Sequence, residues 1–411
     1  MFFFNNRYQT EEFEKKQKDF EISANNDCYP LQQSNIQSTR MNYVPLSVKR
    51  AEFEVVKNDL RLVYQAIVKL LTYYQQQGTL AKEFGLSCDE AELFEKEDYG
   101  AIKGVLRFDL LYSPAGFKVV EIDADPDALF LHDMSFNALA TYFPKNYTSI
   151  YPNHFDLYKR LMDELGVVKG STGLILLDPK VAFREEYEIN RRIFDAFGYH
   201  TKFLPYDETI RFDDFAFVKR AYEFHRMMQN NMSNVLKKLQ TKKCVNPVAF
   251  RLIGYKNAFM YLHTMSAQEI FTDEERDAVA RLIPKTEVYK NDEQRSFLLK
   301  NKDRVVIKPI LGAEGVDVFV GNILTQDEWE GLFVDTVRQD GTWLFQELVD
   351  TAQVAYQDQS GQVSRERYFD FSPHMFVFKD ELVFGKNLVR YSDNKILNVA
   401  QGGSFGYGIE V

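Results

Sequence analysis

The stretch RFDLLYSPAGFKVVEID, residues 107–123, decides how the centre of this chain folds. The segments 105–111 and 117–123 are rich in Val, Leu, Phe and Ile, which favours β-strands. Between them, Ser-Pro-Ala-Gly at 113–116 supplies turn residues. The stretch therefore predicts a β-hairpin, and this hairpin carries one arginine and three acidic residues.

The four charged side chains fall at alternating positions on the two strands. Side chains alternate along a strand, so Arg107 and Asp109 share one face of their strand, as do Glu121 and Asp123. All four lie on the same face only if Asp109 is opposite Glu121 and Arg107 is opposite Asp123. That register requires an odd-numbered loop or a β-bulge near residues 114–116, and we predict it.

Three gathered carboxylates would repel one another and shift each other's pKa unless a divalent cation held them ionised. Hard oxygen ligands at this spacing suit Mg²⁺, which takes a few carboxylates together with phosphate oxygens. Asp109, Glu121 and Asp123 are therefore candidate metal ligands. The same motif also fits a surface hairpin with alternating charge and an internal Arg–Asp pair.

Composition leaves room for an enzyme and disfavours several other classes of protein. With 411 residues, 45% hydrophobic and 27% charged, the chain should form two or three parts, each with a core. The net charge of −10 argues against nucleic acid or an anionic membrane as the main partner. The sequence contains no run of 18 apolar residues, so no membrane span is expected. Cys28, Cys88 and Cys244 are widely spaced, which indicates free thiols in a reducing compartment and a cytoplasmic protein.

Residues 1–95 are predicted to form a helical N-terminal region. From Ser47 onward apolar residues recur at steps of three and four, as in an amphipathic helix, and Gly78 is a plausible stop. We expect this apolar stripe to face the core. It consists of Phe53, Val56, Leu60, Val63, Ile67 and Leu70.

A βαβ unit is predicted in the middle of the chain. Its parts are a buried strand at 173–177, a helix at 185–197 and a second strand at 200–204. Residues 219–240 are predicted to be helical. On that helix Lys219-Arg220, together with Arg226, is expected to belong to a solvated basic face, the alternative being a site for a substrate carboxylate.

A second charged motif is VVIKPILGAEGV, residues 305–316. Its strand ends in Lys308 and leads into a loop that contains Gly312, Glu314 and Gly315. An ammonium group neutralises an anionic ligand, and small residues let backbone N–H groups approach a phosphate. The motif thus favours a nucleotide phosphate site, although a plain strand and turn has the same residues.

Two further segments complete the pattern. Upstream, NPVAFRLIGYKN places Lys256 at the start of a helix. Downstream, WLFQELV at 343–349 predicts an apolar strand whose end carries Gln346, Glu347 and Leu348. Such a strand end is a suitable edge for an adenine ring.

Together these motifs resemble the ATP-grasp ligases, and more narrowly the glutathionylspermidine synthase family, whose ATP-grasp domain is circularly permuted. The resemblance rests on RFDLLYSPAGFKVVEIDADPDAL, NPVAFRLIGYK, VVIKPILGAEGV and FQELV, and it covers residues 100–411. Asp123 stands where the family usually has Asn, which keeps an oxygen ligand and adds a charge. The family's additional amidase domain has no counterpart in this chain.

The resemblance implies a role for each motif. In the family the arginine meets the transferred phosphate, the acidic residues bind Mg²⁺, and the lysines and glycine loop bind ATP. The implied residues are Arg107 as catalytic; Asp109, Glu121 and Asp123 as Mg²⁺ ligands; and Lys256, Lys308, Gly312, Glu314, Gly315, Gln346, Glu347 and Leu348 as nucleotide-binding.

The resemblance also implies an activity. An ATP- and Mg²⁺-dependent ligase would join a small-molecule carboxylate to an amine through an acylphosphate and release ADP. The alternative is a nucleotide-binding protein or phosphotransferase that has the same site and no ligase activity. Neither alternative requires nucleic acid or a membrane.

The implied fold class is α+β, with a circularly permuted ATP-grasp domain, a pre-ATP-grasp βαβ subdomain and a helical N-terminal region. The C-terminal residues Asp370, Arg390 and Asn398 are also similar to the last strands of unpermuted ATP-grasp domains, and they form a rival metal cluster. The expected divisions are the helical region 1–95, the metal-binding hairpin part 96–165, the α/β subdomain 166–245, and the lysine, glycine-loop and adenine part 246–411.

Overall fold

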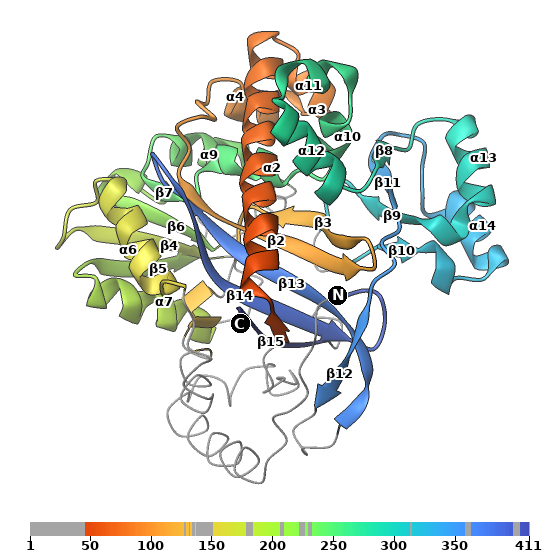
Figure 1. Ribbon diagram of the computed structural model, residues 1–411. Coiled ribbons are helices and arrows are strands. Elements are labelled where there is room, and N and C mark those ends of the chain that lie inside the picture. Colours follow the sequence, from red (N-terminus) through yellow and green to blue (C-terminus); the bar gives the residue numbers. More distant parts are fainter. Residues whose placement is uncertain are drawn as a thin grey trace.

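The computed structural model shows a mixed α/β protein in which the largest sheet lies in the middle, with one smaller sheet on either side (Figure 1). Two of the candidate site residues, Glu314 and Asn398, lie outside the part of the chain that the structure describes. The described residues are 46–126, 129–130, 132–133, 136, 151–177, 184–205, 209–221, 227–228, 232–312, 315–357, 363–397 and 403–410.

The largest sheet has seven strands in the order β1-β15-β14-β13-β2-β3, with β12 also paired to β13. Its pairings are antiparallel except for β1 with β15. The predicted hairpin, β2 and β3, therefore lies beside strands from the C-terminal end of the chain (Figure 1). The strands are β1 Leu46–Val48, β2 Gly104–Ser113, β3 Gly116–Asp123, β12 Gln353–Gln357, β13 Val363–Val377, β14 Leu382–Ser392 and β15 Ser404–Glu410.

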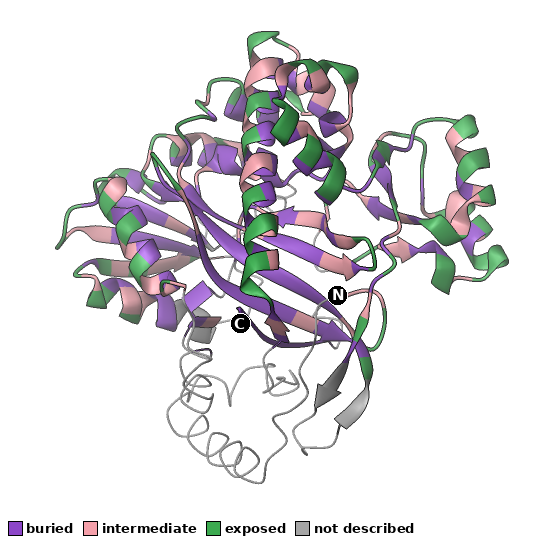
Figure 2. Cartoon of the chain, in the orientation of Figure 1, coloured by how far each residue is buried: buried purple, intermediate pink, exposed green. Residues whose placement is uncertain are grey.

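Helix α2, Arg50–Gln76, covers one face of this sheet, as the apolar spacing predicted. Its Phe53 packs edge-on against Phe117 of β3 and Phe371 of β13, with ring centroids 5.9 and 4.9 Å apart. The chain turns after α2 at Gly78, whose φ of +66° is readily adopted by glycine. Figure 2 shows the exposed residues of α2 on its outer side. Packing against the sheet thus fixes this long helix.

A second sheet is parallel, with the strand order β5-β4-β6-β7. Its strands and the helices around it confirm the predicted βαβ unit. The prediction of a helix from residue 219 is wrong for residues 219–221, because Lys219, Arg220 and Ala221 pair with β4 as part of a strand. The elements are α6 His154–Glu164, β4 Thr172–Leu177, α7 Arg184–Ala196, β5 His200–Pro205, η4 Phe212–Asp214, β6 Phe217–Ala221, α9 Ser233–Gln240 and β7 Cys244–Val245.

The third sheet has the order β10-β9-β11-β8 and forms a separate small unit, coloured cyan to light blue in Figure 1. Helices α13 and α14 pack on it around the buried Trp329 and Leu298. We call this unit the small unit. It contains β8 Thr286–Val288, α13 Asp292–Lys300, η6 Lys302–Arg304, β9 Val305–Pro309, β10 Phe319–Val320, η7 Gly321–Ile323, α14 Gln326–Asp335 and β11 Trp343–Glu347.

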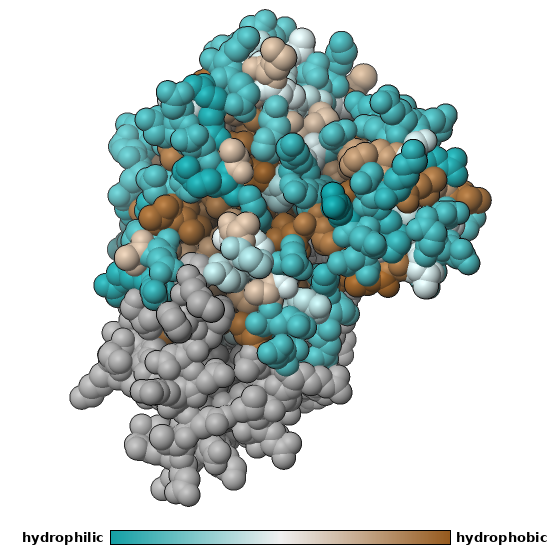
Figure 3. Space-filling model, turned by 45° about the vertical axis from the view of Figure 1, so that its right-hand side comes forward, coloured by the Kyte–Doolittle hydropathy of each residue, from teal (hydrophilic) through white to brown (hydrophobic). Residues whose placement is uncertain are grey.

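Short helices beside the upper half of α2 complete the fold (Figure 1). None of the helices in the described ranges is long and apolar enough to cross a bilayer. The face in Figure 3 is mostly hydrophilic, with hydrophobic side chains in separate patches. The short elements are α3 Leu80–Phe84, α4 Cys88–Phe94, η5 Val248–Gly254, α10 Ala258–Leu262, α11 Met265–Ile270 and α12 Asp273–Leu282.

Candidate active site

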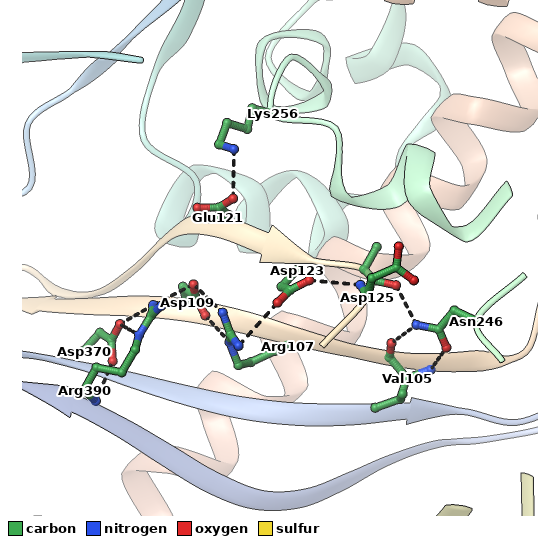
Figure 4. Close-up of polar contacts among 11 residues, drawn as sticks. Val105, Arg107, Asp109, Glu121, Asp123, Asp125, Asn246, Lys256, Asp370 and Arg390 are labelled. Carbon is green, nitrogen blue, oxygen red and sulfur yellow. Dashed lines mark hydrogen bonds and ion pairs between the residues drawn. The ribbon is translucent and has the colours of Figure 1, made fainter. Parts of the chain in front are cut away.

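The hairpin has the predicted register. Arg107 lies opposite Asp123, and Asp109 lies opposite Glu121 (Figure 4). Regular pairing continued from the turn would place Val120 opposite Asp109 and turn the acidic residues to the other face. A β-bulge corrects this, but it lies next to Asp109 rather than at the turn, where pairing is regular. Val120 is the extra residue.

Arginine side chains neutralise the buried carboxylate of the hairpin. Asp109 accepts from Arg107 Nε at 2.7 Å and Nη2 at 3.1 Å, and from Arg390 Nη2 at 2.7 Å. Burial alone would raise the pKa of Asp109, but the two guanidinium groups hold it well below its usual range. The two arginines therefore hold Asp109 ionised in this structure.

The rival cluster belongs to the same site. Strand β13 pairs with both β2 and β14, so Asp370 and Arg390 adjoin the hairpin. Asp370 accepts from the Nε atom and the backbone N–H of Arg390 at 2.7 and 2.9 Å. Arg390 also binds Asp109, and this links the N-terminal and C-terminal motifs. Two of the three residues of the rival cluster therefore lie beside the hairpin, and the third, Asn398, lies outside the described residues.

Lys256 joins the hairpin to the glycine loop. Its Nζ atom lies 2.9 Å from Glu121 Oε1 and donates to the backbone oxygen of Gly312 at 2.7 Å. Burial would raise the pKa of Glu121, but the charge of Lys256 lowers it. Tyr255, the preceding residue, is buried and donates to Glu90 Oε1 of α4 at 2.8 Å. This hydrogen bond holds the backbone from which Lys256 extends.

Lys308 on β9 of the small unit faces the same hairpin. Its Nζ atom donates to the backbone oxygen of the bulged Val120 at 2.9 Å and to Gln346 Oε1 at 3.0 Å. Burial lowers the pKa of Lys308 to about 8, although the charge of Glu121 opposes this shift. The two predicted lysines and Gln346 therefore converge on the hairpin.

The other predicted nucleotide-binding residues that the structure describes belong to the small unit or directly follow it. Gly315 has a φ of +70°, a left-handed conformation that favours glycine. Glu347 ends β11 and is exposed, and Leu348 follows it half-buried. The backbone N–H groups of Glu347 and Leu348 donate to the backbone oxygens of Lys285 and Arg304, respectively.

Asn246 is a site residue that the sequence motifs missed. This buried side chain donates to the backbone oxygens of Val105 and Ala124 at 2.7 and 2.5 Å, and it accepts from the N–H of Val105 at 2.9 Å (Figure 4). It thereby clamps β2 to the residue just after β3. The Asn-Pro dipeptide was a signal for this turn, but not for contacts with the hairpin.

Arg220 is a second residue that the sequence placed wrongly. It is buried in strand β6, not solvated on a helix, and its Nη2 atom lies 2.5 Å from both carboxylate oxygens of Asp125. The N–H of Asp125 in turn donates to Asp123 Oδ1 at 2.9 Å. The parallel sheet is thus linked to the acidic end of the hairpin.

The carboxylates differ in how well they suit Mg²⁺. In the described ranges no three His, Cys, Asp or Glu side chains are placed to hold a metal ion. The side chains of Glu121 and Asp123 are 38% and 26% exposed, and they offer the hard oxygen atoms that Mg²⁺ prefers. Asp109 is buried, with both oxygens bound to arginine. Glu121 and Asp123 contact Lys256 and Arg107 but remain partly exposed, so they fit a Mg²⁺ ion that is also held by phosphate. Asp109 fits only if it releases an arginine.

Comparison with known proteins gives a class of fold. No protein-family model and no curated protein matches the sequence. The structure is similar to that of a glutathione synthetase-like effector from Globodera pallida, with a TM-score of 0.57, 11% identity, and coverage of 97% of this chain and 96% of that one. At this identity the likeness is one of fold, and it agrees with the ATP-grasp-type fold that the sequence resemblance implied.

Two further solved structures match at lower scores. One is a protein from Methylobacillus flagellatus named as a gamma-glutamylcysteine synthetase, with a TM-score of 0.40, 11% identity and coverage of 80% of this chain and 84% of that one. The other is the D-cycloserine synthetase DcsG, with a TM-score of 0.29, 13% identity and coverage of 43% and 58%.

Proposed function

We propose that this chain is an ATP- and Mg²⁺-dependent carboxylate–amine ligase of the ADP-forming type. The observation that carries the proposal is the convergence of Lys256, Lys308 and Gln346 on the face of the hairpin that bears Arg107 and Glu121. Cationic and acidic groups that meet between two units suit a triphosphate bound with a metal ion.

Each group has a defined task in this proposal. Lys256 and Lys308 bind nucleotide phosphates, while Glu121 and Asp123 hold Mg²⁺, which neutralises phosphate charge when bound. Arg107 stabilises the phosphoryl group during transfer. Its orientation is set by the contact with Asp109, which we assign as a positioning residue because both its oxygens are bound to arginine.

The proposed reaction has two steps. A substrate carboxylate oxygen attacks the γ-phosphorus of ATP, and the bond to the β-phosphate oxygen breaks to release ADP. An amine then attacks the acyl carbon, the C–O bond to phosphate breaks with its electron pair on phosphate, and the nitrogen loses a proton. The protein contributes mainly by positioning the reactants and neutralising charge.

Strand order supports a circularly permuted ATP-grasp domain. The hairpin at 104–123 precedes the lysine motifs in the sequence, yet it pairs with strands from 363–410. The parallel sheet with its βαβ unit is then the pre-ATP-grasp subdomain, at 166–245, and residues 46–95 form the helical region. The rest of that predicted region, residues 1–45, lies outside the part of the chain that the structure describes. Residues 96–165 and 246–411 together form the ligase domain.

ADP release tests the proposed function directly. The protein is incubated with Mg²⁺-ATP, amino acids or small carboxylic acids, and hydroxylamine as a general amine. We expect release of ADP and formation of a hydroxamate only when acid and amine are both present. Lys308→Met should abolish both products, and Lys300→Met, an exposed lysine on α13, should not.

Two results would contradict the ligase assignment. ADP release that requires neither acid nor amine would indicate a simple nucleotidase. A phosphorylated product that persists with hydroxylamine present would indicate a phosphotransferase.

A further inference from the structure

The face of the large sheet that bears Arg107 also carries buried polar atoms without partners. Among the described residues these include Ser372 Oγ and His374 Nε2 on β13, and Nδ1 of His132, whose ring lies 6.2 Å from that of His374. Ser372 and His374 are fully buried, and His132 is half-buried. His374 lies directly opposite Arg107, and Ser372 shares its face because side chains alternate. We call these three residues the β13 cluster.

Contacts with the backbone of Lys386 determine the protonation of one of these histidines. The N–H of Lys386 donates to His154 Nε2 at 3.0 Å, and the oxygen of Lys386 lies 3.3 Å from His374 Nδ1. His374 therefore carries its proton on Nδ1 and donates it to this oxygen. The buried Nε2 atom of His374 is left with a free lone pair, which is a hydrogen-bond acceptor.

The cluster lies in a closely packed wall. The rings of His132 and His374 are 6.2 Å apart, and His132 packs against Phe405 of β15 at the same distance. His374 also contacts His154, with ring centroids 4.9 Å apart. A buried polar atom without a hydrogen-bond partner costs free energy. Ser372 and His374, at alternate positions of one strand, both have such an atom, which indicates that a ligand group forms the missing hydrogen bonds.

The charges around the cluster define what that ligand group is. Burial and the nearby charge of Arg107 lower the pKa of His132 to about 3, and burial also keeps the pKa of His374 well below 6.5. Both imidazoles are therefore neutral. Arg107 and Arg390 are already paired with Asp109, Asp123 and Asp370. The cluster thus offers no free cation to an anionic group.

We propose that Ser372, His374 and His132 form a subsite that accepts a hydrogen bond from a neutral O–H or N–H group of the acid substrate. This inference rests on the proposed ligase function, in which the reacting carboxylate lies beside Arg107. His374, which lies directly opposite Arg107, then faces the atoms next to that carboxylate. The subsite selects hydroxy acids and acylated amino acids over simple alkanoic acids.

Matched pairs of acids test this subsite. Isothermal titration of the full chain, saturated with Mg²⁺ and the ATP analogue AMPPNP, measures binding of L-lactate against propionate and of N-acetylglycine against N-acetylsarcosine. Each pair differs chiefly in one O–H or N–H donor. We expect the donor-bearing acid of at least one pair to bind about fivefold more tightly, as for one hydrogen bond.

Variants separate recognition from a structural role. Ser372→Ala and His374→Phe should remove the preference, while His200→Phe, an exposed histidine on β5, should keep it. Ser372→Ala should also leave the melting temperature unchanged or raised, because the hydroxyl has no partner to lose. A hydroxyl needed for the fold would lower it.

Three outcomes would overturn the subsite: equal binding within both pairs, no binding of any of the four acids, or a preference that persists in both variants. If AMPPNP binds in each of these cases, the nucleotide site stands and only the subsite is wrong. If AMPPNP itself does not bind, the proposed function fails, and the subsite fails with it.

Discussion

The depressed pKa of Lys308 predicts a pH dependence for nucleotide binding. Burial lowers this pKa from 10.5 to about 8, so the ammonium group begins to lose its proton just above neutral pH. A bound phosphate would restore the pKa towards 10.5, which means that binding requires proton uptake at high pH. If the pKa is fully restored, affinity falls about tenfold between pH 7 and pH 9.

The same lowered pKa makes the folding stability of the nucleotide-free protein rise with pH, whereas nucleotide affinity falls. Between pH 8 and 10.5 the unfolded chain binds more protons at this lysine than the folded chain, so folding stability rises with pH. The contribution of Lys308 to the unfolding free energy should therefore increase by about 2.5 kcal/mol from pH 7 to pH 10. The difference between wild type and Lys308→Met in urea denaturation measures it.

Isothermal titration with Mg²⁺-ADP from pH 7 to pH 9 measures the effect on binding. Lys308→Arg is the matched control, because a guanidinium keeps its charge across this range and its affinity should be nearly constant. A wild-type affinity that does not change with pH, or an equal decrease in Lys308→Arg, would falsify the assignment of this lysine to the phosphates.

Four further substitutions test the site. Arg107→Ala and Glu121→Ala should each lower acid- and amine-dependent ADP release at least about 100-fold. Glu121→Ala should keep the circular dichroism spectrum of the wild type. Residual activity near wild type in either variant would contradict the proposed roles of these two residues. Arg390→Met leaves two buried carboxylates short of a partner, so urea denaturation should show a loss of about 3–5 kcal/mol, and an unchanged midpoint would refute the pairing. Gly254→Ala would bring a methyl group to 2.7 Å from a backbone oxygen of β3 and should cost about 1–3 kcal/mol, whereas Gly331→Ala in open space on α14 should be neutral or stabilising.

Local pattern was sufficient to predict the hairpin. Its register was predicted from the condition that the four charged side chains share one face, because pairing continued regularly from the turn gives the other register. Alternation set which side chains share a face, and the turn residues set where the chain reverses. The position of the bulge was not predictable, because Val119 and Val120 are identical residues and nothing local distinguishes them. The contact of Lys308 with the oxygen of Val120 is a tertiary feature that only the folded chain reveals.

Cross-strand neighbours explain most of what the sequence did not reveal. Arg390 reaches Asp109 because β13 lies between β14 and β2, and no motif spacing indicates that adjacency. Lys219, Arg220 and Ala221 do not favour a strand strongly, so the sequence predicts the start of a helix where strand β6 forms. Pairing with β4 decides its conformation, as tertiary contacts often do for short segments.

The bulge at Val120 has a consequence for natural variation in hairpin length. A chain that lacked this one residue would form an uninterrupted ladder from the turn and would still set Glu121 beside Asp109. It would lose the carbonyl group that receives Lys308, and the small unit would lose a tie to the hairpin. Homologues one residue shorter at this position should therefore keep their acidic residues in place while their small units open more easily.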